Sequence, residues 1–259
     1  MQVLLSDKNP LLKQVRRAVQ KGALTDDGFA VAEGFHLLEE ALKSNAEIGA
    51  VIVAQSVTGA IESHVKGLRV RVATVRDADF AALASTETPQ GVLTLVKPPA
   101  WTLDQLLRGK SLVAVLDGIQ DPGNAGAILR AAEAFGATGA AFLKGSVSPY
   151  NPKCMRASAG SVFRLPIAQA LDESLLLAAL EKKRGVLYAA MPRAVRPLSD
   201  ANFKISCAIV IGSEGRGVSH HLATRATPLR IPTTGVESLN AAVAAGILFY
   251  EARRQRIAS

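Results

Sequence analysis

The chain has 259 residues, of which 49% are hydrophobic and 20% charged, and its formal net charge at pH 7 is +8. This apolar content is too high for a disordered polymer, and 21 glycines are too few for a collagen. No apolar run reaches the roughly 18 residues of a membrane span, and the first residues lack a signal-peptide pattern. Cys154 and Cys207 are too few for a disulfide framework, and we expect both to be buried as small hydrophobes. These features predict a soluble, cytoplasmic protein with no membrane partner.

The positive charge is concentrated in the second part of the chain. Up to Lys110 there are 13 Lys and Arg against 12 Asp and Glu, and from Ser111 onward there are 17 against 10. Such an excess favours a polyanionic partner, although charge alone also fits a generic basic surface. With one tryptophan and three tyrosines, an aromatic base-stacking platform is not expected. The four histidines show no ligand spacing, and we expect no metal site.

The first hundred residues alternate helical and strand patterns. Apolar residues at helical spacing predict helices at about 11–19 and 35–42. Apolar, β-branched runs predict strands at 29–33, 50–54, 69–73 and 92–97. Strands that alternate with helices indicate an α/β domain. Pro98 and Pro99 resist both helix and ladder, so we expect a domain over 1–98 and a linker over 99–110.

A second α/β domain is expected over 111–259. The continuous apolar run 112–116 is typical of a strand buried on both faces, as in a parallel sheet. Further strands are predicted at 140–143, 186–190 and 208–211, and helices at 124–135, 175–183 and 238–254. Asn124 is a good N-cap for the first of these helices, and Ser238 or Asn240 for the last.

Three segments of this second domain depart from ordinary core and loop sequence. In the first, a strand runs into a polar Gly/Pro turn and then into an apolar helix that contains Arg130, either a solvated residue or a functional one. In the second, glycines 212, 215 and 217 follow an apolar strand with a spacing that is neither a dinucleotide fingerprint nor a P-loop. In the third, residues 229–245 lead into a helix of small residues that allows close packing. Each segment alone also fits a purely structural role.

Together, in their order and spacing, the three segments resemble the SpoU/TrmH family of S-adenosylmethionine-dependent RNA ribose 2′-O-methyltransferases, within the SPOUT group. The residues that match its motifs are Asn124, Gly126 and Arg130; Gly212, Glu214 and Gly215; and Ile231, Pro232, Ser238, Leu239 and Asn240. The resemblance covers about residues 111–254. In addition, residues 32–35 and 88–92 resemble parts of the small RNA substrate-binding domain that many members carry.

The resemblance implies a C-terminal parallel-sheet α/β domain with a trefoil knot, preceded by a smaller α/β RNA-binding domain. It implies an S-adenosyl-L-methionine site formed by Leu143, Ile211, Gly212, Gly215, Gly217, Ile231, Pro232 and Leu239. The implied catalytic residues are Arg130, Asn124, Glu214, Ser238 and Asn240. Arg130 activates the ribose hydroxyl in the family's proposed mechanism; stabilising alkoxide charge and clamping a phosphate are alternatives, because an arginine is a poor base.

The resemblance also implies a homodimer whose interface uses the final helix, and an RNA partner, with ribosomal RNA favoured. Lys13, Arg16 and Arg17 lie on the first predicted helix and are candidate RNA-binding residues, although an ordinary solvated helix face is the alternative. A tRNA target, an rRNA methylation that confers antibiotic resistance, and a non-catalytic RNA-binding protein stay open. A nucleotide-dependent dehydrogenase is disfavoured, because no G-x-G-x-x-G follows a strand.

Overall fold

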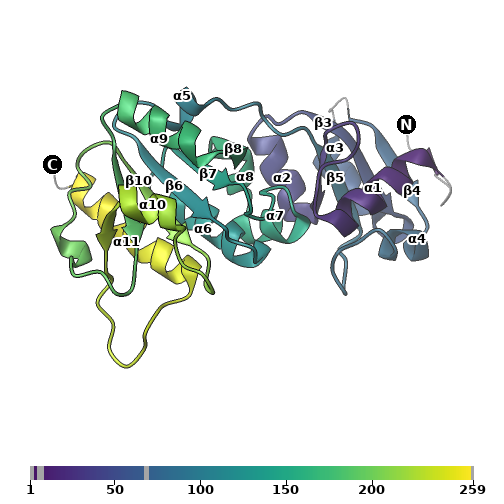
Figure 1. The fold of residues 1–259 in the computed structure, drawn as a ribbon. Coiled ribbons are helices and arrows are strands. Elements are labelled where there is room, and N and C mark those ends of the chain that lie inside the picture. Colours follow the sequence, from purple (N-terminus) through teal and green to yellow (C-terminus); the bar gives the residue numbers. More distant parts are fainter. Residues whose placement is uncertain (1–2, 5–8, 67–69, 258–259) are drawn as a thin grey trace. The chain divides into compact units, whose positions relative to one another are not determined.

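The chain forms two compact units in a computed structural model that describes residues 3–4, 9–66 and 70–257. One unit comprises Met1–Ala100 together with Tyr150–Arg164, and the other comprises Trp101–Pro149 and Leu165–Ser259 (Figure 1). The segment Tyr150–Arg164 therefore belongs to the first unit, although it lies in the sequence among residues of the second.

The first unit is built on a five-stranded mixed sheet of order β1-β4-β3-β5-β2. Its strands are β1 (Val3–Leu4), β2 (Ala30–Glu33), β3 (Ile48–Ala54), β4 (Val72–Val75) and β5 (Val92–Val96). Strands β1, β4 and β3 run parallel, whereas β5 is antiparallel to β3 and β2. Residue 69, where we expected β4 to start, lies outside the described residues, and the described strand begins at Val72, which pairs with Val51 of β3.

Short helices flank this sheet. They are α1 (Pro10–Lys21), α2 (Phe35–Lys43), the 3-10 helix η1 (Gln55–Val57), α3 (Thr58–Val65), α4 (Asp77–Ala81), α7 (Pro152–Ser158) and α8 (Ser161–Arg164). Helix α1 shows how local sequence sets these boundaries. The Asn9 side chain accepts from the Leu11 amide, Pro10 opens the first turn, and Gly22 ends the helix in the left-handed conformation.

The second unit contains a six-stranded sheet of order β11-β9-β10-β6-β7-β8, in which every pair is parallel. The strands are β6 (Leu112–Asp117), β7 (Gly139–Leu143), β8 (Ile167–Leu171), β9 (Val186–Ala190), β10 (Cys207–Gly212) and β11 (Thr227–Leu229). This confirms the predicted parallel-sheet α/β class. The trefoil knot stays a prediction.

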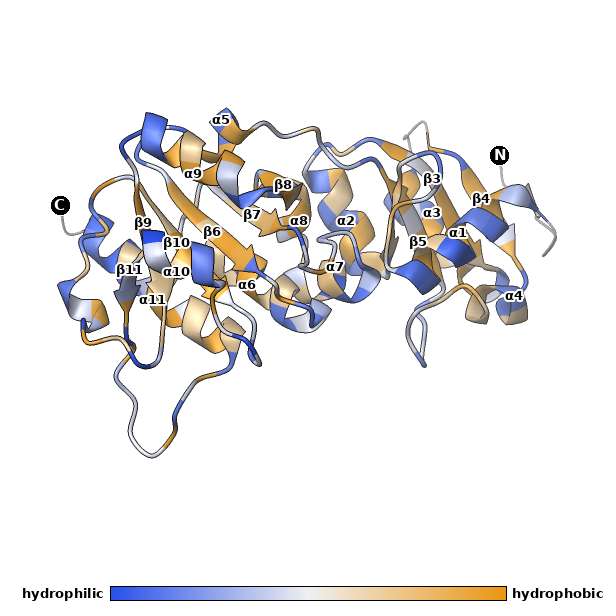
Figure 2. Ribbon diagram, in the orientation of Figure 1, coloured by the Kyte–Doolittle hydropathy of each residue, from blue (hydrophilic) through white to orange (hydrophobic). Residues whose placement is uncertain are grey.

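Helices cover both faces of this sheet. They are α5 (Leu103–Leu106), α6 (Pro122–Ala134), α9 (Glu173–Lys182), α10 (His220–Arg225) and α11 (Ala241–Ile257), with a 3-10 turn η2 (Leu198–Asp200). Val113 and Val115 of β6 share one core cluster with residues of α5, α9 and α10. Because side chains alternate along a strand, the intervening residues of β6 face the opposite side, where α6 and α11 pack together. Figure 2 shows these central strands as apolar along most of their length.

The starts of three helices in the second unit differ from expectation, and one of them is α9, which begins at Glu173 rather than at 175. Helix α6 begins at Pro122 and is capped by Asp121, whose side chain accepts from the Asn124 amide at 2.7 Å; the prediction of Asn124 as the cap is wrong. Proline fits the first helical turn, so the helix starts two residues earlier and frees the Asn124 side chain. Helix α11 begins at Ala241 rather than at 238, directly after Asn240.

Two further sequence predictions concern the core and membrane spans. Both cysteines are buried, as predicted, and they are not joined in a disulfide. No helix of the described residues is long and apolar enough to cross a membrane.

Candidate active site

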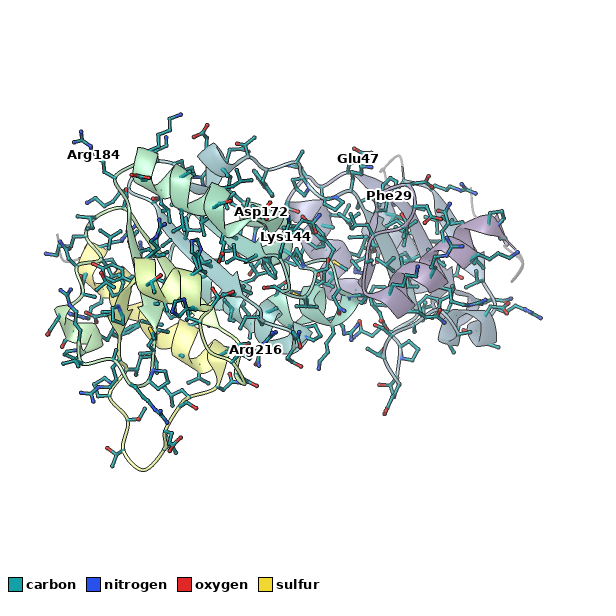
Figure 3. All side chains as sticks on the ribbon, viewed as in Figure 1. Phe29, Glu47, Lys144, Asp172, Arg184 and Arg216 are labelled. Carbon is teal, nitrogen blue, oxygen red and sulfur yellow. The ribbon has the colours of Figure 1, made fainter. Side chains whose placement is uncertain are left out.

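Polar residues gather where the parallel strands of the second unit end. Lys144 follows β7 and Asp172 follows β8, and the two form an exposed ion pair with a 2.7 Å separation (Figure 3). Asp117 ends β6, and its Oδ2 accepts from the Ser219 amide at 2.6 Å, which ties the loop after β10 to this edge. Ligands of open parallel sheets bind at this carboxyl edge, so the site is expected here.

Asn124, Glu214 and Asn240 form a hydrogen-bonded cluster at that edge, which we call the amide–carboxylate cluster. Asn124 Nδ2 and Asn240 Nδ2 each donate to Glu214 Oε1 at 2.8 Å, and Asn240 Nδ2 also lies 3.0 Å from Asn124 Oδ1. The three residues come from α6, the loop after β10 and the start of α11. All three sequence motifs thus contribute one side chain to a single point.

The capping role of Asn240 determines how its amide points. Its Oδ1 accepts from the amides of Ala242 and Val243 at 2.9 and 3.2 Å, which identifies Asn240 as the residue that caps α11. With the oxygen held by the helix, Nδ2 is the atom left to face Glu214. Both asparagine amides donate to Oε1 of Glu214, and no described residue donates a side-chain hydrogen bond to Oε2. Oε2 is therefore available to a hydroxyl donor on a ligand.

An apolar cleft adjoins the cluster at the ends of β9, β10 and β11. It has a volume of about 140 Å³, roughly ten times the space that one buried water needs. Five predicted cofactor residues line it: Ile211, Gly212, Gly217, Ile231 and Leu239. Glu214 and Ser238, predicted as catalytic, line it as well. The walls are mainly aliphatic with a few polar groups at the rim, which is the usual composition of a small-molecule site.

Close backbone approach shapes the glycine loop beside this cleft. The loop folds back on itself, with Gly217 N donating to Ser213 O at 2.8 Å and with Gly217 at a φ of +68°. A Cβ at Gly212 would meet the backbone of Gly217 and Val218 at less than the 3.0 Å that real Cβ atoms keep. Gly212 is therefore required by packing within the loop, whereas a Cβ at Gly215 would meet nothing within 4 Å.

A polar hollow of about 230 Å³ at the ends of β6 and β10 shares Ser213, Glu214 and Ala241 with the apolar cleft. Its walls are the turn 118–121, Asn124, the loop 213–216 and Ala241. Gly215 belongs to this hollow rather than to the apolar cleft, and so does Arg216, which Figure 3 labels on the loop after β10. Glu214 of the cluster therefore borders both an apolar space and a polar one.

Several predicted residues lie elsewhere. Leu143 is buried in the core at the end of β7, two strands from β10, and does not line the cleft. Pro232 is exposed on the loop after β11 and is not among the lining residues. Arg130 follows Asn124 by six residues on α6, a rotation of about 240° and a rise of about 9 Å. It is exposed, and no partner for it occurs among the described residues.

The three candidate RNA-binding residues lie on the outer face of α1. Lys13 and Arg17 are exposed and Arg16 is half-buried, while Leu12, Val15 and Ala18 of the same helix enter the core. Arg17 is paired with Asp26 at 3.0 Å, with more than half of both side chains exposed.

Sequence reasoning missed part of the site. Ala190, Met191 and Pro192 line the apolar cleft from the end of β9, and Asp117 anchors the glycine loop. The strand at 186–190 was predictable, but the neighbour order β9-β10 that brings its end to the cleft has no local sequence signal. Asp117 directly follows the predicted strand 112–116, and this position is the one sequence signal that points to it.

Comparisons with known proteins agree with this geometry. Residues 111–250 match the model of the SpoU rRNA Methylase family, and residues 9–94 match an MRM3-like substrate binding domain. The chain therefore belongs to the SpoU rRNA methylase family, which confirms the resemblance of the three motifs and identifies the protein as a methyltransferase.

Full-length relatives include an uncharacterized tRNA/rRNA methyltransferase of Synechocystis sp., 34% identical over 99% of this chain and 95% of its own. The 23S rRNA (guanosine(2553)-2′-O)-methyltransferase of Bacillus subtilis is 30% identical over 98% of this chain and 100% of its own. Among solved structures, the SpoU methyltransferase AviRb of Streptomyces viridochromogenes in complex with AdoMet superposes with a TM-score of 0.88. It is 25% identical and covers 97% of this chain and 100% of its own.

Proposed function

We propose that the protein transfers a methyl group from S-adenosyl-L-methionine to a ribose 2′-hydroxyl of ribosomal RNA. The amide–carboxylate cluster carries this proposal, because it holds one carboxylate between an apolar cleft and a polar hollow. A methyl donor and a polar acceptor must meet at such a boundary for in-line transfer. The names of the relatives, which include an rRNA 2′-O-methyltransferase, support the choice of reaction.

The apolar cleft fits the cofactor by its chemistry. Ile211, Ile231 and Leu239 offer aliphatic surface for an adenine, and the glycine loop offers backbone hydrogen-bonding groups close to it. When bound, the cofactor supplies a methyl group activated on a sulfonium. A neighbouring structure of the same fold, AviRb, was solved with AdoMet, which supports the same ligand here.

The chain's own residues orient the acceptor. Glu214 accepts a hydrogen bond from a ribose hydroxyl through its Oε2, and the two asparagines hold the carboxylate in place for it. Ser238 lines the cleft and positions the loop after β11. Arg130 stabilises negative charge, because its guanidinium stays protonated. The charge is either that of the developing alkoxide or that of the adjacent phosphate.

The final helix supports a homodimer as the working form. Its inner face is buried through Ala241, Ala245, Leu248, Phe249 and Ala252. Val243, Tyr250 and Ile257 follow one another at seven-residue steps and are 52%, 56% and 64% exposed. Large apolar side chains repeated along one stripe of a helix indicate a protein contact. A monomer in sedimentation at micromolar concentration would refute the dimer.

The first unit binds the RNA in this proposal. Residues 1–98 form the RNA-binding domain, and residues 99–110 link it to the methyltransferase domain. The match of residues 9–94 to a substrate-binding domain supports this division. Lys13, Arg16 and Arg17 contact RNA phosphates from the outer face of α1. Replacing all three with alanine is expected to weaken RNA binding and its salt dependence while leaving cofactor binding intact. A cytoplasmic location is part of the proposal, and the similarity to a 23S rRNA methyltransferase of Bacillus subtilis supports it.

Variants of Arg130 separate chemistry from cofactor binding. Arg130→Ala is expected to abolish methyl transfer and to leave S-adenosylmethionine affinity within a few-fold, because Arg130 does not line the cleft. Arg130→Lys should also fail largely, since a point charge does not reproduce a planar bidentate fork. Calorimetry and a radiolabelled methyl-transfer assay measure the two effects, and near-normal turnover of Arg130→Ala would contradict the assignment.

The RNA itself is identified by mapping ribose methylation in cells with and without the protein. Loss of one 2′-O-methyl group in ribosomal RNA is the expected result. A missing group in tRNA would replace rRNA as the substrate, and an unchanged map in all RNA would favour a non-catalytic RNA-binding protein.

A further inference from the structure

Two sequence motifs of the first unit have no role in the methyl-transfer site. They are residues 32–35 and 88–92, which end β2 and precede β5. In the structure both motifs, with Arg156 of α7, line a cavity of about 300 Å³ that belongs entirely to this unit. Its lining residues are Glu33, Gly34, His36, Leu37, Thr86, Thr88, Gln90 and Arg156.

A buried ion pair forms the floor of this cavity. The Glu33 side chain is only 4% exposed, and its Oε2 accepts from the Ser85 amide at 3.0 Å and from Arg156 Nη1 at 3.1 Å. The hydroxyls of Ser85 and Thr86 also donate to this carboxylate. Burial alone would raise the pKa of Glu33, but these hydrogen bonds and the Arg156 charge outweigh it and hold the pKa below its ordinary value. The carboxylate is therefore ionised and fully engaged.

The groups left around the cavity are mainly hydrogen-bond donors. Arg156 is 29% exposed and uses Nη1 for Glu33 and Ser85, so Nε and Nη2 are not engaged by any described residue. Gln90 accepts from the Phe35 amide through Oε1, which turns its NH₂ group away from that bond. The exposed Thr88 and His36 add a hydroxyl and an imidazole at the rim.

The shape of the cavity depends on a close approach between the two motifs. Gly34 has a φ of +101°, and a Cβ there would meet Gln90 Oε1 at 2.8 Å. A side chain at this position would displace the amide end of the flexible Gln90 side chain, which lines the cavity. Leu37, which is 2% exposed, contributes an apolar wall. The result is a preformed space with one apolar wall and a rim that carries the N–H donors of Arg156 and Gln90 beside a hydroxyl and an imidazole, which can donate or accept.

We infer that this cavity binds one unpaired nucleotide of the RNA substrate through the hydrogen-bond acceptors of that nucleotide. This inference rests on the proposed function in one respect, namely that the macromolecule bound is RNA. A donor-rich cavity selects acceptor atoms, which a nucleotide offers on its phosphate and on its base carbonyls. Protein recognition of RNA commonly uses bases that are unstacked from loops and ends, and arginine contacts both phosphates and base acceptors.

The test uses the full-length protein and a labelled single-stranded 12-nucleotide RNA of mixed sequence. Thr88→Glu puts a carboxylate at the exposed rim, where it repels acceptor atoms without disturbing the core. Gln55→Glu is the matched control, because it makes the same charge change at an exposed residue of this unit outside the cavity. Thr88→Glu is expected to weaken binding by roughly tenfold, the scale of losing one good base or phosphate contact, and the control by less than threefold.

Two further probes identify what the cavity holds. The same strand paired into a duplex should bind Thr88→Glu and Gln55→Glu equally, because it offers no unpaired nucleotide. An abasic 12-mer keeps the sugar–phosphate backbone and lacks the bases, so phosphates are its charged hydrogen-bond acceptors. If Thr88→Glu weakens binding of the abasic strand as well, the phosphate is the ligand; if it weakens only the intact strand, the base is.

Equal affinities of Thr88→Glu and Gln55→Glu for the intact strand would overturn the inference. Calorimetry with S-adenosylmethionine keeps this failure distinct from failure of the proposed function. If the two variants bind RNA equally but still bind the cofactor and methylate RNA, the role of the cavity in RNA binding is refuted and the proposed methyltransferase function stands. A wild-type protein that methylates no RNA would remove the proposed function instead. Arg156→Gln, which also removes donors but unbalances buried Glu33, should weaken the same single strand as a second variant.

Discussion

Gly212 offers the sharpest test of how the glycine loop makes the cofactor cleft. A Cβ at this residue would meet three backbone atoms, namely C and O of Gly217 and N of Val218, all inside the 3.0 Å limit. Backbone atoms cannot rotate away as a flexible side chain does, so the turn 213–217 must move. Forcing one methyl group into a packed site costs about 1–3 kcal/mol. Gly212→Ala is therefore expected to lower the free energy of unfolding by about 2 kcal/mol.

The matched control is Gly215→Ala on the same loop, where a Cβ would meet nothing within 4 Å. It should change stability by less than about 0.5 kcal/mol, as for an ordinary surface substitution. Urea unfolding measures the stability of each variant, and calorimetry measures S-adenosylmethionine affinity. Gly212→Ala should lose cofactor affinity by at least tenfold, because the moved turn lines the cleft. Equal stability and equal affinity in the two variants would refute the reasoning.

Three more outcomes follow from particular contacts. Asn240→Asp keeps the cap on α11 but puts a second carboxylate against Glu214, so unfolding at pH 7 should become easier by about 1 kcal/mol, and Asn240→Ser, which adds no charge, should lose less. The pKa of Glu33 is lower in the folded state than in the unfolded state, so the ionised carboxylate stabilises the fold. This contribution to the free energy of unfolding is complete above the ordinary glutamate pKa of about 4.3 and is lost as the pH falls below that value. Unfolding free energies from pH 5 to 3 should therefore fall less steeply in Glu33→Gln, and equal slopes would contradict this. Arg256 donates to the carbonyls of Lys110, Ser111, Phe203 and Ile205 at 2.7–2.8 Å. Arg256→Ala should cost about 3 kcal/mol in urea unfolding, against under about 0.5 for the exposed Arg253→Ala.

Periodicity predicted the central strands well, because β3, β6 and β10 are continuous apolar runs buried on both faces. The two edge strands of the second unit were missed for physical reasons. Strand β11 spans only Thr227–Leu229 and includes Pro228, and β8 has an irregular burial pattern with Ala170 at a φ of +48°. Neither segment carries an alternating or continuous apolar pattern.

The candidate site was predictable in its members but not in its contacts. Family resemblance named Asn124, Glu214 and Asn240, and they meet because β6 and β10 are neighbouring parallel strands. The resemblance also named Leu143, yet β7 lies on the far side of β6 from the cleft. Strand order depends on tertiary packing of whole elements, so no local pattern distinguishes these two cases.

The segment Tyr150–Arg164 has a consequence for how the protein can be divided. It lies between β7 and β8 in the sequence, yet it packs with the first unit, where Arg156 pairs with Glu33 and Arg164 with Glu40. A fragment that begins at residue 101 would keep α7 and α8 but lose β2, which α7 contacts, and both glutamates that pair with Arg156 and Arg164. No single cut in the polypeptide yields two self-sufficient halves, so truncated proteins would report on damage rather than on the isolated activity of either unit.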